Sequence, residues 1–300
     1  MEDIEFLADT GTADVQGVIP SIWSKLVEVA ARPKRVYRSY VKFNTDLLNK
    51  AGDSVRIPRR STLTAAAIAE GGTITPEALT FGTALTLTPT EFGVAVKLSR
   101  QSVERTQINL LQDATEELAQ SLAQIEDTEI RDSLNAATSN TLYGGDSTGS
   151  ADIAAGDVLT PQLIAEAIKE VRKNDFEPSV IFIAPQQEWQ LGTQDQFVNA
   201  ATYGVRDFIK TGKIASYLGV DVRTTTNCPS GTGGIGTNVP YHVCLMVDGK
   251  RAAALALKRN PSIDKQYLPL ERKYVIAATM DFDSGLLNDA AVCKITVSDS

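Results

Sequence analysis

The stretch from Asn109 to Ala137, NLLQDATEELAQSLAQIEDTEIRDSLNAA, carries the strongest secondary-structure signal in the chain. Its apolar residues recur at steps of three or four, and this spacing is typical of a helix with one buried face. They are Leu111, Ala114, Leu118, Leu122 and Ile125, with Ile130 and Leu134 continuing about one residue out of phase. Asn109 followed by Gln112 is a capping-box variant, so the helix should begin at Leu110. We predict one helix over residues 110–137, about 42 Å long at 1.5 Å per residue.

The opposite face of this predicted helix is acidic. It carries Glu116, Glu117, Glu126, Asp127, Glu129 and Asp132, and residues 99–137 have a net charge of −5. Upstream, residues 25–60 hold ten Lys or Arg against three acids, a net charge of +7. Charged faces of this kind are commonly just solvated, and the alternatives are contact with an oppositely charged neighbour or with phosphates.

Composition limits the class of protein. The chain has 300 residues, 43% of them hydrophobic, which is enough for a substantial core. A net charge of −8 argues against a surface built as a whole to hold nucleic acid. Three cysteines without C-x-x-C spacing make a disulfide framework improbable on sequence grounds, and no apolar run approaches the ~18 residues of a membrane span. We therefore expect a globular protein made in a reducing cytosol, with no membrane partner.

The first hundred residues predict an arm, a short helix and a long hairpin. Residues 1–24 contain five acids and no base, which indicates an extended arm, and the pattern from Ile19 to Ala30 predicts a short amphipathic helix stopped by Pro33. Residues 52–98 form an antiparallel excursion whose return strand alternates Phe92, Val94, Val96 and Leu98. Its Ala-, Gly- and Thr-rich tip cannot form its own core, so it is either disordered or lies on a partner.

The second half predicts mixed helices and strands. Residues 139–157 indicate a loop, and Thr160-Pro161 opens a helix whose core face is Leu163, Ile164, Ala167, Ile168 and Val171. The run VIFIA, residues 180–184, indicates a strand buried on both faces, and helical turns follow near residues 187–196. Further strands are expected at 241–247, 252–257, 272–282 and 291–297.

Motifs of enzymes are present only as isolated fragments. Gly231, Gly233 and Gly236 spell G-x-G-x-x-G, but no helix can open after them at Asn238-Val239-Pro240. Ser262 to Lys265 spells S-x-x-K and residues 210–212 spell K-T-G, in the wrong order for a penicillin-binding enzyme. The single histidine, His242, has too few partners for a triad or a zinc site, and the Asp281/Asp283 pair is typical of a turn. We assign no catalytic, cofactor-binding or metal-binding residue.

The order of these elements resembles the tailed-phage major capsid proteins, whose Hong Kong 97-like fold is shared with encapsulins. The resemblance is carried by VRIP, AEGGTITPEALT, GVAVKLSRQSVE, the acidic helix, VIFIAPQQ and GKIASYLGVDVRTT. It implies an α+β chain with an N-terminal arm and short helix at 1–49 and an extended loop at 50–98. It also implies a peripheral domain at 99–157 and 258–282, with 110–137 as its spine helix, and an axial domain at 158–257 and 283–300.

The same resemblance implies a function: a major capsid protein that assembles into an icosahedral virion shell around double-stranded DNA. An encapsulin-like compartment is the first alternative, and an α/β enzyme with an unrecognised site is the second. The implied partners are further copies in hexamers and pentamers, a separate scaffolding protein, a portal, and DNA bound without sequence preference; an added cement protein is the alternative to overlap of loops and arms as the source of stability. We expect synthesis in the host cytoplasm. The candidate intersubunit contacts are Arg35, Arg38, Arg59, Arg60, Glu70, Glu116 and Glu117.

The extended loop lacks the nucleophile used for covalent cross-linking by some members of that family. Those members join a lysine on the loop to an asparagine on a neighbour. Residues 51–96 contain no lysine, and Lys50 and Lys97 lie at the base of the loop. We therefore predict a shell held together without such cross-links.

Overall fold

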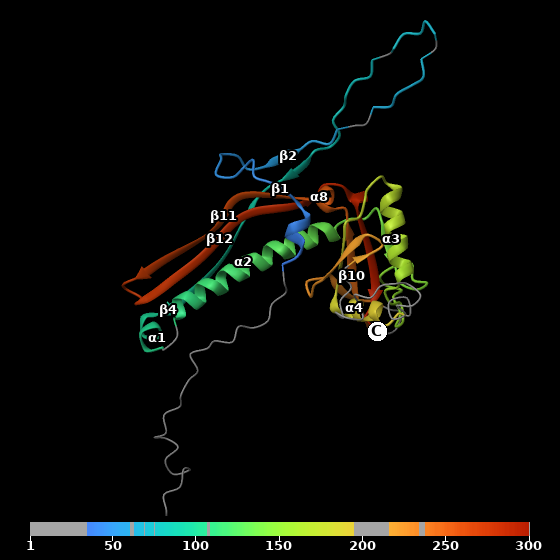
Figure 1. Cartoon of the computed structure of the whole chain (residues 1–300). Coiled ribbons are helices and arrows are strands. Elements are labelled where there is room, and N and C mark those ends of the chain that lie inside the picture. The colour runs from blue at the N-terminus through green and yellow to red at the C-terminus, as the bar shows by residue number, and fades with distance from the viewer. Residues whose placement is uncertain are drawn as a thin grey trace, which may run out of the picture.

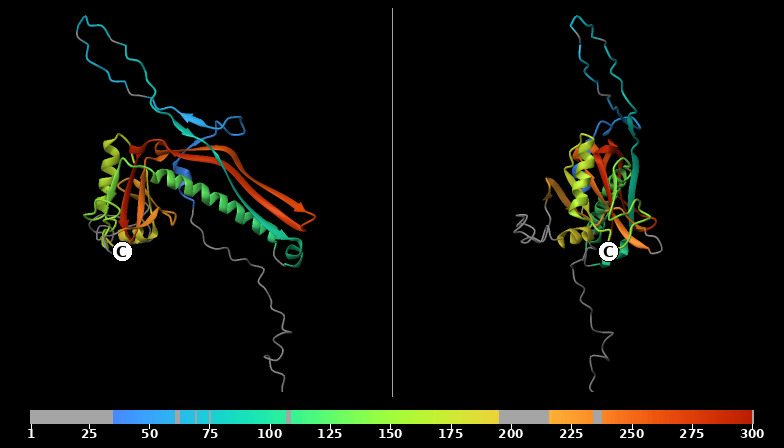
Figure 2. Two further views of the ribbon diagram at one scale, coloured as in Figure 1. Left: turned by 180° about the vertical axis from the view of Figure 1, so that it is seen from behind. Right: turned by 90° about the vertical axis from the view of Figure 1, so that its right-hand side faces the viewer.

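The computed structural model describes residues 35–60, 63–68, 70–74, 76–106, 109–194, 216–233 and 238–299. These residues form two large sheets and one of two strands: the first large sheet lies in an elongated part with a long helix beneath it, and the second lies in a compact part at one end (Figure 1). A loop projects away from both (Figure 2). The predicted arm, the predicted helix from Ile19 to Ala30 and the K-T-G fragment lie outside the described residues. No helix among the described residues is long and apolar enough to span a membrane.

The long helix is α2, Leu110–Asn135. Asn109 Oδ1 accepts a hydrogen bond from the backbone N–H of Gln112 at 3.4 Å, which confirms the predicted N-cap and first residue. The helix ends two residues before the predicted end and is about 39 Å long. Leu118, Leu122, Ile130 and Leu134 are buried, as the apolar stripe predicts.

The elongated part is a four-stranded sheet in the order β1-β11-β12-β4. Its strands are β1 (Lys42–Asn44), β4 (Thr90–Ser99), β11 (Ala253–Leu268) and β12 (Lys273–Leu286). Alternate side chains of β4 are half-buried, Phe92, Val94, Val96 and Leu98, which confirms the alternation in the sequence. The strand β12 supplies Ile276, Ala278, Met280 and Phe282 to the core under α2. A short helix α1 (Arg100–Arg105) joins β4 to α2.

The compact part is built on a seven-stranded sheet in the order β5-β13-β10-β6-β8-β7, with β9 paired to β10. The strands are β5 (Thr141–Tyr143), β6 (Val180–Ile183), β7 (Ser216–Tyr217), β8 (Val220–Thr224), β9 (Ser230–Gly233), β10 (Val239–Val247) and β13 (Val292–Ser298). All of β6 is buried between β10 and β8, which confirms the prediction from VIFIA.

Helices complete this compact part. The helix α3 (Pro161–Lys173) has Pro161 at its start, and Thr160 Oγ1 accepts from the N–H of Leu163 at 3.3 Å. Its buried residues include Ile164, Ala167, Ile168 and Val171, as predicted. The other helical elements among the described residues are α4 (Pro185–Gly192), the short helix α8 (Gly249–Ala252), and the 3-10 turns η1 (Tyr37–Tyr40), which contacts α2, and η2 (Asp289–Ala291).

The projecting loop is a hairpin only at its base. The strands β2 (Val55–Ile57) and β3 (Leu85–Leu87) pair antiparallel, and an isolated bridge joins Arg60 to Phe81. Between these two residues the described chain has no strand. The extended tip follows from its composition, because Ala, Gly and Thr offer little apolar surface to bury.

The sheets group residues differently from several of the expected domain bounds, and the division into domains itself stays a prediction. We expected the loop to run from 50 to 98, but β4 belongs to the four-stranded sheet through its pairing with β12. We placed residues 99–157 in the peripheral domain, but β5 pairs with β13 in the compact sheet. The strand expected at 252–257 is part of the much longer β11, and residues 283–286 continue β12.

Candidate assembly surfaces

The segment that contains η1 crosses α2 and is fixed there by a carboxylate. Asp127 Oδ1 accepts hydrogen bonds from the backbone N–H of Val36 at 3.1 Å and of Tyr37 at 3.0 Å. Its other oxygen accepts from Asn227 Nδ2 at 3.3 Å. Asp127 is only 2% exposed, and burial raises its pKa while these hydrogen bonds oppose the rise.

Tyr37 extends this crossing into the compact part. It is fully buried, its hydroxyl donates to the backbone carbonyl of Asn227 at 2.9 Å, and its ring centroid lies 4.3 Å from that of Phe182 in β6. Burial raises the pKa of Tyr37, and it raises that of the neighbouring Cys228 thiol to about 12. Both groups are therefore neutral at physiological pH and act as packing residues.

Glu126 lies next to Asp127 and is also buried, with 1% exposure. Its Oε2 lies 2.6 Å from Nη1 of Arg38. Its Oε1 has no hydrogen-bond partner among the described residues. Burial raises the pKa of Glu126, and the Arg38 and Arg35 guanidinium groups act against the rise.

The placement of Glu126 and Asp127 on the outer face, opposite the apolar stripe, was wrong because both are buried. The apolar stripe of α2 drifts around the helix, and these two positions turn inward where η1 crosses. Glu116 and Glu117 are exposed, as expected for that face.

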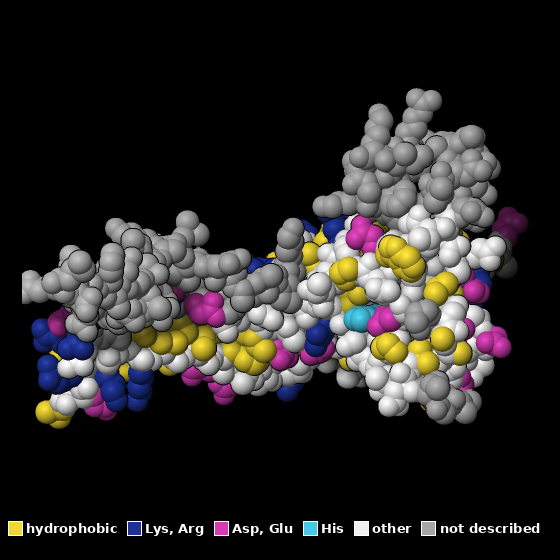
Figure 3. All heavy atoms as spheres, turned by 90° about the horizontal axis from the view of Figure 1, so that it is seen from below, with side chains coloured by type: hydrophobic (Ala, Val, Ile, Leu, Met, Phe, Trp, Pro, Cys, Tyr) yellow, Lys and Arg dark blue, Asp and Glu magenta, His cyan; other side chains and the backbone are white. Residues whose placement is uncertain are grey.

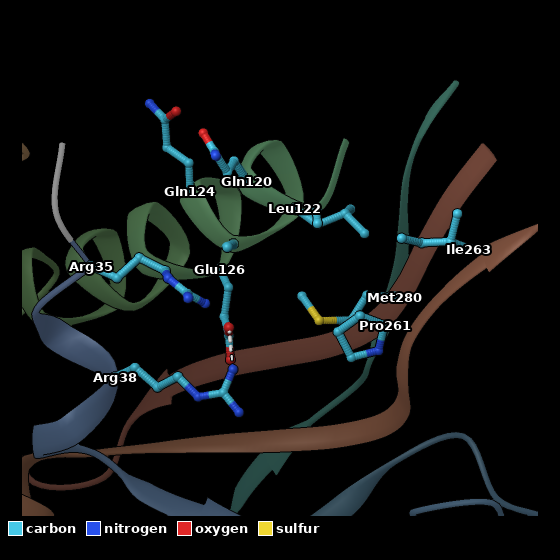
Figure 4. A pocket seen from close by; sticks show the side chains of 11 residues that line it. Arg35, Arg38, Gln120, Leu122, Gln124, Glu126, Pro261, Ile263 and Met280 are labelled. Atoms are coloured by element: carbon cyan, nitrogen blue, oxygen red, sulfur yellow. Dashed lines mark hydrogen bonds and ion pairs between the residues drawn. The ribbon is translucent and has the colours of Figure 1, made fainter. Parts of the chain in front are cut away.

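A half-open pocket lies beside this crossing (Figure 4). Its volume is about 530 Å³. Leu122 of α2 with Pro261, Ile263 and Met280 of the β11–β12 hairpin forms its apolar wall. Its polar wall is formed by Arg35, Arg38, Glu126, Gln120 and Gln124, and two small residues of α2, Ala119 and Ala123, also line the pocket. In the close-up, Glu126 points from α2 toward Arg38 and a dashed line marks their ion pair, on the opposite side of the view from Leu122, Met280 and Ile263.

The projecting loop carries a second candidate surface. Five of its large apolar side chains are exposed, by between 46% and 71%: Leu63, Ile68, Ile74, Leu79 and Phe81. Glu70 and Arg60 are also exposed. Arg59 instead donates from Nη2 to the backbone carbonyl of Leu287 in its own chain, so it anchors the base of the loop.

A third candidate surface is charged, and it was not predicted from the sequence. Figure 3 shows Lys and Arg side chains gathered at the far end of the elongated part, with acidic side chains beside them. The basic residues of α1 and of the β11–β12 turn lie at this end: Arg100, Arg105, Lys265, Arg272 and Lys273. They are scattered in sequence, and only the return of β12 beside β4 brings them together, so no single segment could reveal them.

The seven predicted contact residues therefore fall on separate surfaces. Arg35 and Arg38 meet in the pocket, Arg59 and Arg60 lie at the loop base, Glu70 lies in the loop tip, and Glu116 and Glu117 lie on α2. Arg38 pairs with Glu126 of its own chain. A contact of any of them with a neighbouring subunit stays a prediction.

The enzyme-like fragments that the structure describes take part in strand pairing and in contacts between side chains. Gly231 and Gly233 lie in β9 and pair with β10, while Gly236 lies outside the described residues. Ser262 Oγ is 3.2 Å from Thr279 Oγ1 on the next strand. His242 Nδ1 lies 2.6 Å from Asp299 Oδ1, and the described residues contain no group of three side chains placed to bind a metal ion.

Comparison with known proteins gives one family and many similar folds. A family model described as phage capsid protein matches residues 82–295. The chain is similar to the solved capsid of Ralstonia phage GP4, with a TM-score of 0.73 and 18% identity, covering 99% of this chain and 98% of that one. A structure from Mycobacterium phage Che8 gives a TM-score of 0.72 and 20% identity over 92% and 96% of the two chains. The capsid of cyanophage P-SCSP1u gives 0.79 and 13% identity over 98% and 97%. A search of curated proteins found no match.

Proposed function

The chain belongs to the phage capsid protein family, and from that premise we propose that many copies of it assemble into a closed icosahedral shell that encloses double-stranded DNA. The family and the fold of the similar structures make it a major capsid protein with a Hong Kong 97-like α+β fold. It is therefore a structural protein of the virion, not an enzyme.

The observation that carries the closed-shell proposal is the projecting loop. Its exposed apolar side chains have no core of their own, and fully burying one such side chain contributes about 1.5–3 kcal/mol. A loop laid over a neighbouring subunit removes this surface from water in every copy. Closed symmetry repeats the same contact around the assembly, so a modest gain per copy accumulates.

The finer partners belong to the same proposal. We expect hexamers and pentamers of this chain, a separate scaffolding protein and a portal, with synthesis in the host cytoplasm, and the shell stabilised either by overlap of loops and arms or by a cement protein. DNA is held through phosphates without sequence preference, because the chain is acidic overall and supplies only local basic surfaces.

Electron microscopy and native mass measurement test the shell directly. The purified protein should give closed particles in the megadalton range, and a small oligomer would contradict the proposal. Nuclease-protected double-stranded DNA inside particles distinguishes a viral capsid from an encapsulin-like compartment, which would hold a cargo protein.

A matched pair of leucine variants tests the loop. Leu63 and Leu218 are each 56% exposed, the first in the loop and the second in the β7–β8 turn. We expect Leu63→Asp to reduce particle yield sharply and Leu218→Asp to preserve it. Normal particles from Leu63→Asp would show that the loop is not an assembly contact.

A further inference from the structure

We propose that the pocket beside α2 is the docking site for residues 20–31 of the same chain, with Trp23 as the anchoring side chain. In this arrangement the indole N–H of Trp23 donates a hydrogen bond to Glu126 Oε1. The proposal does not depend on shell formation, because it concerns a contact within one subunit.

The unpartnered carboxylate oxygen indicates what kind of group the pocket takes. Glu126 is only 1% exposed. Its Oε2 binds Arg38, but its Oε1 has no hydrogen-bond partner among the described residues. A buried acceptor without a partner costs about 1–3 kcal/mol, so a donor supplied by an occupant relieves that cost. The occupant should therefore present an N–H or O–H group to the pocket.

The rest of the pocket favours an apolar occupant. Leu122, Pro261, Ile263 and Met280 line one wall, and Ile263 is still 37% exposed. A volume of about 530 Å³ is within the range of roughly 300–1,000 Å³ that accommodates a sizeable ligand or several side chains. The fitting group is thus a large apolar body with one donor, which is the chemistry of a tryptophan side chain.

Residues 20–31, PSIWSKLVEVAA, contain such a side chain, Trp23, in a pattern typical of a helix with one apolar face. Trp23, Leu26, Val27 and Ala30 recur at helical spacing, with Lys25 and Glu28 on the other side. This apolar face needs a partner to cover it. Trp23 would enter the pocket, and Leu26 and Val27 would cover its apolar wall.

The position of Arg35 makes this contact reachable. Arg35 is the first described residue and itself lines the pocket. A helix from residue 23 to 31 would be about 12 Å long, and the four chain steps from residue 31 to Arg35 span at most about 13 Å. The segment that carries Trp23 is therefore long enough to reach the pocket that Arg35 lines.

The extended loop of a second copy is a poorer occupant. Residues 61–82 offer hydroxyl donors from Ser and Thr, but they contain no Trp or Tyr, so no side chain in the loop combines a large apolar body with a donor for Glu126.

Tryptophan fluorescence tests the docking in the full chain. The chain has two tryptophans, and Trp189 is 65% exposed, so Trp189→Phe leaves Trp23 as the only emitter. In dilute unassembled subunits we expect blue-shifted emission that is protected from acrylamide. Adding Ile263→Glu in the pocket wall should shift the emission to the red and raise the quenching constant several-fold. Leu270→Glu, at a fully exposed position of the same hairpin, should change neither.

Proteolysis gives an independent readout in case Ile263→Glu fails to fold. Trypsin should cleave after Lys25 slowly in the unaltered chain and several-fold faster in Trp23→Ala, whereas Trp189→Ala should leave the rate unchanged. Solvent-exposed Trp23 in both subunits and particles would overturn the proposal. Protection that develops only on assembly would also overturn it, because the occupant would then be a neighbouring copy.

Discussion

Replacing Asp127 with alanine should be the most damaging change of a single acidic residue on α2. The substitution removes the acceptor for the N–H groups of Val36 and Tyr37, and each buried donor left unpaired costs about 1–3 kcal/mol. It also removes the bond from Asn227. The raised pKa of Asp127 shows that burying its charge already carries a cost, which the substitution recovers in part. We expect the free energy of unfolding to fall by about 2–4 kcal/mol.

Denaturant unfolding of unassembled subunits, followed by circular dichroism, measures this effect. The matched control is Glu116→Ala, which removes the same charge type from the same helix. Glu116 is exposed and accepts one hydrogen bond from Gln112, so its loss should cost less than about 0.5 kcal/mol. If the two variants unfold at the same denaturant concentration, Asp127 does not anchor the crossing and the reasoning fails.

Three further predictions concern pH, assembly and covalent chemistry. Burial raises the pKa of Glu126 in the folded chain above its value in the unfolded chain, so on acidification the folded chain binds this proton at a higher pH than the unfolded chain does. The free-energy cost of burying Glu126 therefore shrinks as pH falls from neutral towards the unfolded-state pKa. Glu126→Gln should flatten the pH dependence of the unfolding midpoint, and an unchanged slope would contradict the assignment. Arg60→Glu should impair particle formation while the subunit stays folded, whereas Arg59→Glu should also loosen the loop base because Arg59 binds Leu287 of its own chain; normal particle yield from Arg60→Glu would exclude charge complementarity at this position. Boiled particles on a denaturing gel should give one band near 32.3 kDa, because the loop has no lysine from 51 to 96, and a covalent ladder would place a nucleophile elsewhere.

Elements with local signals were predictable from the sequence. Asn109 and Gln112 fix the start of α2, Thr160-Pro161 fixes that of α3, and the uninterrupted apolar run of β6 indicates a strand buried on both faces. Each signal lies within a few residues of the element that it defines. The alternation in β4 was equally local, although its partner strand β12 lies about 180 residues further along the chain.

The features that the sequence did not reveal depend on pairing between distant segments. The sequence of β4 does not say whether it pairs with β2 in a hairpin or with β12 in a sheet, so the expected loop, residues 50–98, included a strand of the four-stranded sheet. The two carboxylates of α2 look like any other acids on a charged face until η1 is placed across them. The pocket has the same origin, because its walls come from α2, from the segment before β1 and from the β11–β12 hairpin.

The burial of Asp127 follows from the way η1 begins. The first turn of a helix leaves backbone N–H groups without partners, and Val36, at the cap position, has no side-chain oxygen to accept from them. Asp127 of α2 supplies that oxygen from another element, so it caps η1 across the interface. Asn227, which follows β8, binds both Asp127 and the Tyr37 hydroxyl. Hydrogen bonds thus join η1, α2 and the segment after β8 at one point. At this point η1 crosses α2, which covers the four-stranded sheet, and Tyr37 of η1 packs against Phe182 in the core of the seven-stranded sheet. This fixes Arg35, the first described residue, and the pocket that it lines in a constant position relative to both sheets.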